Sequence, residues 1–264
     1  MSTRTQCSPR SSEQGFTLVE LSIVLVIIGL IVGGVLVGQD LIKAAEVRAT
    51  VGQVEKYNSA LNTFRTRFNA MPGDISNVAA TNFGLAARTG NAGEGDANGL
   101  IEGSAAGAMV ADGEINLFWN DLTFANLVEG NFTGTNAPAT TAAAAPVASF
   151  MPPARVGRGN HIAVYANGGL NFYQVAGVTG IAAGVYTMTA NLTPTEAFNM
   201  DNKIDDGLPT TGVAQSRGGA VMNAAATAGA GGAAAAFCNN TTPTPNVYNT
   251  LNEAPLCMLR FRFN

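Results

Sequence analysis

Charged residues and histidine are scarce in this chain of 264 residues. Charged residues make up 12% of it, against about 25% in an average soluble domain. The 14 Lys and Arg and the 18 Asp and Glu give a net charge of −4, so the strongly basic surface typical of nucleic-acid binding is missing. The single histidine, His161, excludes a zinc site made of several histidines and leaves one position for a histidine base. We therefore expect neither a nucleic-acid partner nor an enzyme.

Long apolar runs are equally rare, since only one occurs. No charged residue lies between Leu21 and Gln39, and a helix of about 20 such residues, rising about 1.5 Å each, crosses the apolar core of a bilayer. Residues 16–39 thus predict one transmembrane helix. The preceding segment has a net positive charge and Asp40 follows the run. We therefore expect the amino terminus in the cytoplasm and the rest of the chain on the other side of the membrane.

A carboxylate, Glu20, lies near the start of this run. An acid within hydrocarbon costs about 2.5 to 3.5 kcal/mol on insertion scales, so such a residue is by default functional and paired. The alternative is a side chain that extends to the membrane interface.

The start of the run resembles the processing site and first helix of type IV pilins and type II secretion pseudopilins, on the residues Gly15-Phe16-Thr17-Leu18-Val19-Glu20. The resemblance implies that a prepilin peptidase removes residues 1–15 as a leader by cutting between Gly15 and Phe16. It also implies that the same peptidase/methyltransferase system methylates the new amino terminus at Phe16.

The resemblance further implies that Glu20 pairs with the amino-terminal amine of a neighbouring subunit and sets the register of assembly. A subunit in the wrong register would leave two buried charges unpaired, at a cost of about 3 to 5 kcal/mol. The implied partners are other copies of the chain in a helical filament, the membrane, and an inner-membrane assembly platform with its ATPase. No cofactor is implied.

The apolar pattern beyond the membrane predicts that the helix continues. Its apolar residues recur at spacings of three and four, which places them on one helical face: Val47, Val51, Val54, Tyr57, Leu61, Phe64 and Phe68. No proline interrupts residues 16–71, and Pro72-Gly73 is expected to end the helix. Residues 16–71 therefore predict a long spine helix, whose second half packs against the protein's own head.

The head, residues 72–264, is expected to combine short helices with a small antiparallel sheet, which makes the fold class α+β. Glu114 to Glu129 have near-helical apolar spacing, with Trp119 in the core. His161 to Val175 predict a hairpin around Asn167-Gly168-Gly169, with His161 at a strand end. Thr193-Pro194-Thr195-Glu196 has the form of a capping box and predicts a polar surface helix closed by Gly207-Leu208-Pro209.

Two segments without charge, residues 130–154 and 218–252, are rich in Ala, Gly and Thr. Their residues are too small for a dense core, so we expect surface loops that serve as spacers or as a binding surface.

Cys238 and Cys257 would be the only cysteines left once the leader is removed. They lie in the part expected to be exported and oxidised, so we predict a disulfide, which resembles the carboxy-terminal disulfide loop of many pilins. Closing a loop of this length contributes about 3 kcal/mol.

Two acidic groups have the residue types that bind calcium. Glu94, Asp96 and Asn98, followed by Gly99, resemble the opening of an EF-hand loop, although Ala105 stands where that loop needs glutamate. Asp201, Asp205 and Asp206 form a second group near a predicted helix end. The sequence is compatible with two alternatives for each group, a calcium site or an acidic turn exposed to water.

The sequence thus favours a structural subunit of a type IV pilus-like filament, made at a bacterial inner membrane and lying at the surface or in the periplasm after assembly. The first alternative is a pseudopilin of a type II secretion system. The second is a periplasmic binding protein or enzyme that keeps the helix as a plain anchor, a role for which Glu20 has no use.

Overall fold

The computed structural model describes residues 15, 17–88, 94–103, 110–133, 147–182, 184–217, 238–240 and 245–263. The chain divides into two units, residues 1–42 and 43–264. The second unit contains helices and an antiparallel sheet, which confirms the α+β class. Residues 1–14, Phe16, Ala105 and the greater part of the two segments rich in Ala, Gly and Thr lie outside the described residues.

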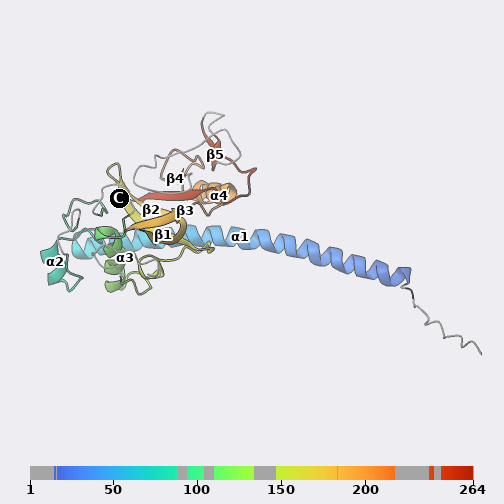
Figure 1. The fold of residues 1–264 in the computed structure, drawn as a ribbon, viewed down its shortest axis with the longest axis horizontal. Helices are drawn as coiled ribbons and strands as arrows, with labels where there is room; N and C mark the ends of the chain where they lie inside the picture. Colours follow the sequence, from blue (N-terminus) through green and yellow to red (C-terminus); the bar gives the residue numbers. More distant parts are fainter. Residues whose placement is uncertain are drawn as a thin grey trace, which may run out of the picture. The chain divides into compact units, whose positions relative to one another are not determined.

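Helix α1, Leu18–Phe68, is the long helix that the sequence predicts. The apolar side chains of its first part are exposed in the single chain, and this part is long and apolar enough to cross a membrane. In its second part the whole predicted stripe from Val47 to Phe68 is buried. Figure 1 shows strands of the sheet beside this second part.

The end of α1 differs from the prediction, because the helix stops three residues before Met71. Asn69 has a φ of 53°, the left-handed conformation that ends many helices. Its N–H still donates a 2.8 Å hydrogen bond to the carbonyl of Arg65. Asn69 therefore ends the helix before Pro72 is reached.

A five-stranded antiparallel sheet forms the centre of the head. Its main path runs in the order β1-β2-β7-β4, and β3 pairs with β2. The strands are β1 Asn160–Asn167, β2 Leu170–Ala182, β3 Val185–Thr189, β4 Ala214–Arg217 and β7 Met258–Phe263. A second, two-stranded sheet pairs β5, Asn239–Asn240, with β6, Val247–Tyr248.

The predicted hairpin is confirmed between β1 and β2. Asn167 pairs with Leu170, and the two residues between them, Gly168 and Gly169, have φ values of 61° and 74°. Two positive φ angles in a two-residue loop give the tight turn whose twist suits a hairpin, and glycine adopts them at little cost.

Short helices complete the head: α2 Asn77–Asn82, α3 Gly113–Phe124, the 3₁₀ turn η1 Val147–Ser149 and α4 Pro194–Ile204. Helix α3 ends five residues before Glu129, since Asn126 takes the left-handed conformation. Helix α4 has the predicted capping box at Thr193. The expectation of a wholly surface-lying α4 is wrong, because Ala197, Met200 and Asp201 are buried on one face.

An aromatic cluster joins α1, α3 and the sheet. The ring of Trp119, 1% exposed, lies 4.7 Å from that of Tyr57 and 5.0 Å from that of Phe118. Tyr173 on β2 lies 4.2 Å from Phe263 on β7 and 6.2 Å from Trp119. Trp119 is therefore a core residue, as expected, and the last strand of the chain helps to cover it.

Candidate functional site

Glu20 closes a capping box at the start of α1. Its Oε2 accepts a hydrogen bond of 2.8 Å from the N–H of Thr17 and another of 2.8 Å from the Thr17 hydroxyl. The N–H of Glu20 in turn donates to the Thr17 hydroxyl at 3.2 Å. The sequence Thr-x-x-Glu produces this reciprocal arrangement, which satisfies amide groups that the first helical turn leaves without partners. Glu20 therefore has a partner within its own chain, which the sequence argument did not anticipate.

The capping box uses one carboxylate oxygen of Glu20 twice. Its other oxygen, Oε1, accepts no hydrogen bond from the residues that the structure describes. The carboxylate lies at the amino-terminal end of a helix, where the backbone dipole favours negative charge. Gly15 is described and exposed, while Phe16 is not described.

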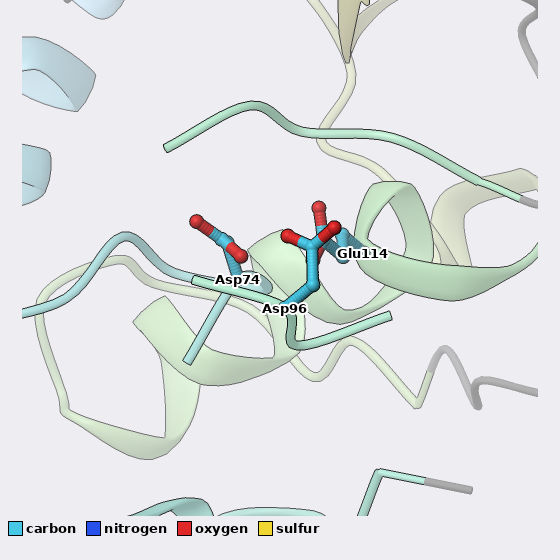
Figure 2. A group of neighbouring side chains, drawn as sticks. All are labelled: Asp74, Asp96 and Glu114. Carbon is cyan, nitrogen blue, oxygen red and sulfur yellow. The ribbon is translucent and has the colours of Figure 1, made fainter. Parts of the chain in front are cut away.

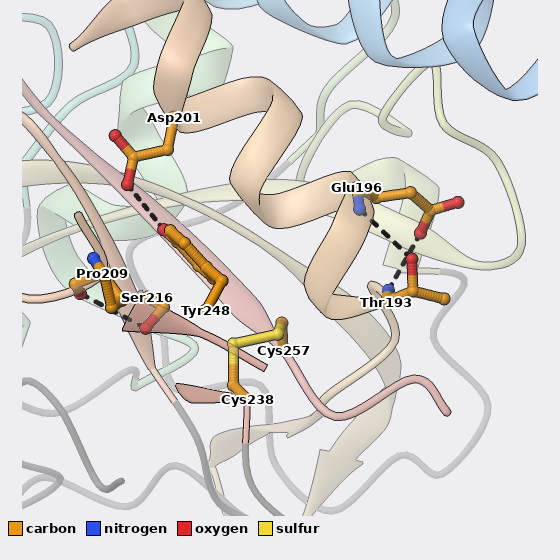
Figure 3. Close-up of a disulfide and its surroundings, with 8 residues drawn as sticks. All are labelled: Thr193, Glu196, Asp201, Pro209, Ser216, Cys238, Tyr248 and Cys257. Carbon is orange, nitrogen blue, oxygen red and sulfur yellow. Dashed lines mark hydrogen bonds between the residues drawn. A yellow bond between two sulfur atoms is a disulfide. The ribbon is translucent and has the colours of Figure 1, made fainter. Parts of the chain in front are cut away.

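The disulfide between Cys238 and Cys257 is present, which confirms the prediction. Both cysteines are fully buried. Cys257 exchanges two backbone hydrogen bonds with Leu192, of 2.9 and 3.0 Å, just before α4 begins. Figure 3 shows the disulfide beside α4, with the capping residues Thr193 and Glu196 at the first turn of the helix.

The second predicted acidic group lies at the other end of α4. One carboxylate oxygen from each of Asp201, Asp205 and Asp206 lies within 4.8 Å of the other two. The pKa of Asp201 is raised to about 6. Burial is the largest cause, hydrogen bonds from Tyr248 and Gly207 lower the pKa, and the neighbouring charges of Asp206 and Asp205 make smaller raising contributions.

Each of these three carboxylates accepts hydrogen bonds from nearby groups. Asp201 accepts from Tyr248 at 2.6 Å and from the N–H of Gly207 at 3.2 Å. Asp205 accepts from backbone N–H groups at the start of β4. Asp206 accepts from the N–H of Leu208 and from the hydroxyl of Thr211. The group thus organises the turn after α4 with donors of the protein itself.

The first predicted acidic group has a different membership in space. Asp96 lies with Asp74 and Glu114, and one carboxylate oxygen from each of the three lies within 4.8 Å of the other two. Asn98 instead stabilises the turn to which it belongs. Its side-chain amide donates to Asp96 at 2.9 Å, and its side-chain oxygen accepts from the N–H of Leu100 at 2.6 Å. Figure 2 shows the carboxylates of Asp74, Asp96 and Glu114 gathered in one place.

Three separate segments position this group, which we call the acidic triad (Asp74, Asp96 and Glu114). Asp74 follows the chain turn after α1, Asp96 belongs to the loop 94–103, and Glu114 lies in the first turn of α3. The loop is tied to the other two: Glu114 accepts from the N–H of Gly95 at 2.7 Å and from that of Glu102 at 3.0 Å. Asp74 accepts from the N–H of Gly99 at 2.6 Å.

Burial dominates the electrostatics of the triad. The pKa of Glu114 is raised to about 9, with desolvation as the largest cause and the nearby charge of Asp74 as a smaller one. Desolvation also raises the pKa of Asp74, with a smaller contribution from the charge of Asp96. Sequence reasoning found Asp96 by its spacing but missed Asp74 and Glu114, because no local motif links positions so far apart in the chain.

A buried ion pair beside the triad was also missed. Arg88 donates to Oδ2 of Asp121 at 2.6 Å, and both side chains are almost fully buried. The same oxygen accepts from the N–H of Gly73 at 2.7 Å. Desolvation raises the pKa of Asp121 although the charge of Arg88 lowers it, so burial is the larger effect. The pair fixes the turn after α1 to α3.

His161 lies in β1, next to the strand end, as expected. Its Nδ1 lies 3.0 Å from the carbonyl oxygen of Gly159. Burial lowers the pKa of His161, which favours the neutral ring. The hydrogen-bonding contact of the described ring is thus with a backbone carbonyl of its own chain segment.

The comparisons with known proteins give one match. Residues 10–36 match the family model described as the prokaryotic N-terminal methylation motif, a range that includes Gly15, Phe16 and Glu20. Neither a curated protein nor a solved structure matches the chain. The apolar helix that begins within the motif, at Leu18, is present in the structure. Residues 10–36 of the chain thus carry the prepilin-type signature that type IV pilins and pseudopilins share.

Proposed function

We propose that this protein is a structural subunit of a type IV pilus-like filament and polymerises through its amino-terminal helix. The methylation motif at residues 10–36, which includes the first turns of an exposed apolar helix that begins at Leu18, carries the proposal. Before assembly lipid covers such a helix, and in a filament the helices of other subunits cover it. The partners of the chain are then other copies of itself, the inner-membrane assembly platform and its ATPase.

Processing is the first step of this proposal. A prepilin peptidase/methyltransferase cuts between Gly15 and Phe16 and methylates the new terminus at Phe16. The positive leader before the apolar helix supports an orientation with the leader in the cytoplasm, where the peptidase acts, and with the head in the periplasm.

Glu20 then sets the register of assembly through its charge. The capping box holds the carboxylate at a defined place and engages only Oε2, so Oε1 is available to the amine of a neighbouring subunit. Opposite charges in an apolar helix bundle are tolerated when paired, and a shifted subunit would leave both unpaired. The helix also contains Gly34 and Gly38, a spacing that lets helices in a membrane approach closely.

The pilus is favoured over a secretion pseudopilus by the disulfide-closed carboxy-terminal loop and by the segments rich in Ala, Gly and Thr. The role is structural, since the motif is typical of filament subunits and His161 is engaged with a backbone carbonyl. A plain membrane anchor on a periplasmic binding protein or enzyme would have no use for the charge of Glu20.

Mass spectrometry of the protein from native membranes tests the processing. We expect an amino-terminal peptide that begins with N-methylated Phe16, and Gly15→Ala should abolish it. An intact Met1, or a cut elsewhere, would support the plain anchor instead.

Electron microscopy of a deletion strain then tests the appendage. Loss of surface filaments, restored by the wild-type gene, supports the pilus. A secretion defect in a strain that never forms such filaments would replace the pilus with the pseudopilus.

A further inference from the structure

We propose that the acidic triad of Asp74, Asp96 and Glu114 binds a calcium ion in the head. The proposal stands on the geometry of the head alone and does not depend on the filament function. It replaces the ligand set that the sequence suggested, in which Asp96 was joined by Glu94 and Asn98.

The spacing of the triad suits calcium. Two oxygens bound to one Ca²⁺ at about 2.4 Å are at most about 4.8 Å apart, and one oxygen from each carboxylate meets this limit. The three side chains approach from the turn after α1, the loop 94–103 and α3 (Figure 2). Carboxylate oxygen is the ligand type that Ca²⁺ prefers.

A second observation points to a ligand at the same place. Asp74 is 2% exposed, and its Oδ1 is buried without a hydrogen-bond partner among the described residues. Its Oδ2 accepts from the N–H of Gly99, so only Oδ1 lacks a partner. A buried charged oxygen without a partner is costly, and a bound cation would remove that cost.

Among the described residues, no ion pair compensates the charge of the triad. Neither of the ion pairs between described residues, Arg88–Asp121 and Arg158–Glu196, includes a triad carboxylate. The backbone N–H groups that bond Glu114 orient its carboxylate, as outer hydrogen bonds orient the ligands of metal sites. A calcium ion would bring the missing positive charge.

The site has access to water. Asp96 is exposed, and Asp74, Gly99 and Arg65 line a cavity of about 220 Å³ beside the triad. Calcium takes six to eight oxygen ligands, and water entering through this cavity would complete the set. The bound ion would join the loop 94–103 to α3 and to the turn after α1.

Calorimetric titration of the full-length protein in detergent tests the proposal, after treatment with EDTA and its removal. We expect one Ca²⁺ per chain, with a dissociation constant of about 10⁻⁴ to 10⁻³ M, as in extracellular modules. Saturating CaCl₂ should also raise the midpoint of thermal unfolding, because the ion binds the folded chain only. No heat and no thermal shift at about 10 mM CaCl₂ would overturn the proposal, and the three carboxyls would then share protons instead.

The key variant is Asp96→Asn, because this side chain is exposed and the variant should fold, as checked by circular dichroism. We expect its affinity for Ca²⁺ to fall at least about tenfold, and Asp74→Asn to have a similar or larger effect. Asp206→Asn is the matched control from the other acidic group and should bind as the wild type does. Unchanged binding in Asp96→Asn, or loss of binding in Asp206→Asn, would refute the site. An equal effect of MgCl₂ would refute its assignment to calcium.

Discussion

The hydroxyl of Tyr248 donates a 2.6 Å hydrogen bond to Oδ2 of Asp201, which joins the disulfide loop to helix α4 (Figure 3). Asp201 is fully buried, and Tyr248 is 5% exposed. Without this donor, Oδ2 of Asp201 would lie in the core with no hydrogen-bond partner from the loop. This hydrogen bond therefore attaches the loop between Cys238 and Cys257 to α4, in addition to the disulfide that closes the loop.

Tyr248→Phe should destabilise the folded head by about 1 to 3 kcal/mol, the cost of leaving a buried acceptor without its donor. Urea unfolding of the purified protein measures the change. Tyr173→Phe is the control, since the buried Tyr173 hydroxyl has no hydrogen-bond partner among the described residues. Equal losses in the two variants would show that the hydroxyl of Tyr248 has no special role.

Asp201 should make the stability of the head depend on pH. Its pKa is raised to about 6 in the folded protein from an ordinary value of 3.8. A raised pKa means that the folded chain holds the proton more tightly, so this stabilisation is fully present below about pH 3.8 and is lost as the pH rises through about 6.

The comparison of wild type with Asp201→Asn isolates this effect. The free energy of unfolding of the wild type, relative to the variant, should fall between about pH 4 and pH 7. Urea titrations at several pH values measure the difference. A difference that is constant across this range would contradict the raised pKa.

Removal of the disulfide by Cys238→Ser together with Cys257→Ser should cost about 3 kcal/mol, since the bond closes a loop with a sequence separation of 19 residues. Thermal unfolding with and without a reducing agent measures it. The reducing agent should lower the midpoint of the wild type and leave that of the double variant unchanged. A wild type that is insensitive to reduction would mean that the loop is held by its other contacts.

The buried ion pair of Arg88 and Asp121 predicts that a double variant is more stable than the single variant that removes Arg88 alone. Arg88→Met should cost about 3 to 5 kcal/mol, because it leaves a buried carboxylate without its ion-pair partner. Adding Asp121→Asn should recover part of this loss, because the asparagine oxygen still accepts from Gly73 and carries no charge. Additive losses in a double-mutant cycle would disprove the coupling.

Glu20→Gln separates the two roles of Glu20, the capping box and the charge. Glutamine also closes capping boxes, so the variant keeps the contact with Thr17 and loses only the charge. We expect normal cleavage after Gly15 and at least a tenfold loss of filaments, about the effect of 1.4 kcal/mol on an equilibrium. Filament yield by electron microscopy and processing by immunoblot provide the two readouts.

Thr17→Ala is the matched variant, since it removes the cap and keeps the charge. Its filament yield should exceed that of Glu20→Gln. The opposite order would show that the cap, and not the charge, is what assembly requires.

Local patterns predicted the parts of the fold that depend on near neighbours in the chain. The stripe from Val47 to Phe68 follows from helical spacing, and the hairpin turn at Gly168-Gly169 follows from the need for two positive φ angles. The end of α1 was misplaced because the left-handed Asn69 gives a weaker signal than Pro72. The capping box of α4 was predicted, whereas its buried face was not, since burial depends on what packs against the helix.

By itself, the sequence determined the prepilin-type motif, the apolar helix with Glu20 near its start, and the pairing of Cys238 with Cys257, because each depends on residue type, position along the chain and local spacing. Only the tertiary structure decided that Asp74 and Glu114 join Asp96, that Arg88 meets Asp121 and that Tyr248 reaches Asp201. These contacts join segments that are distant in the chain. Their partners are selected by the packing of the aromatic core, in which α1, α3 and the last strand share one interior.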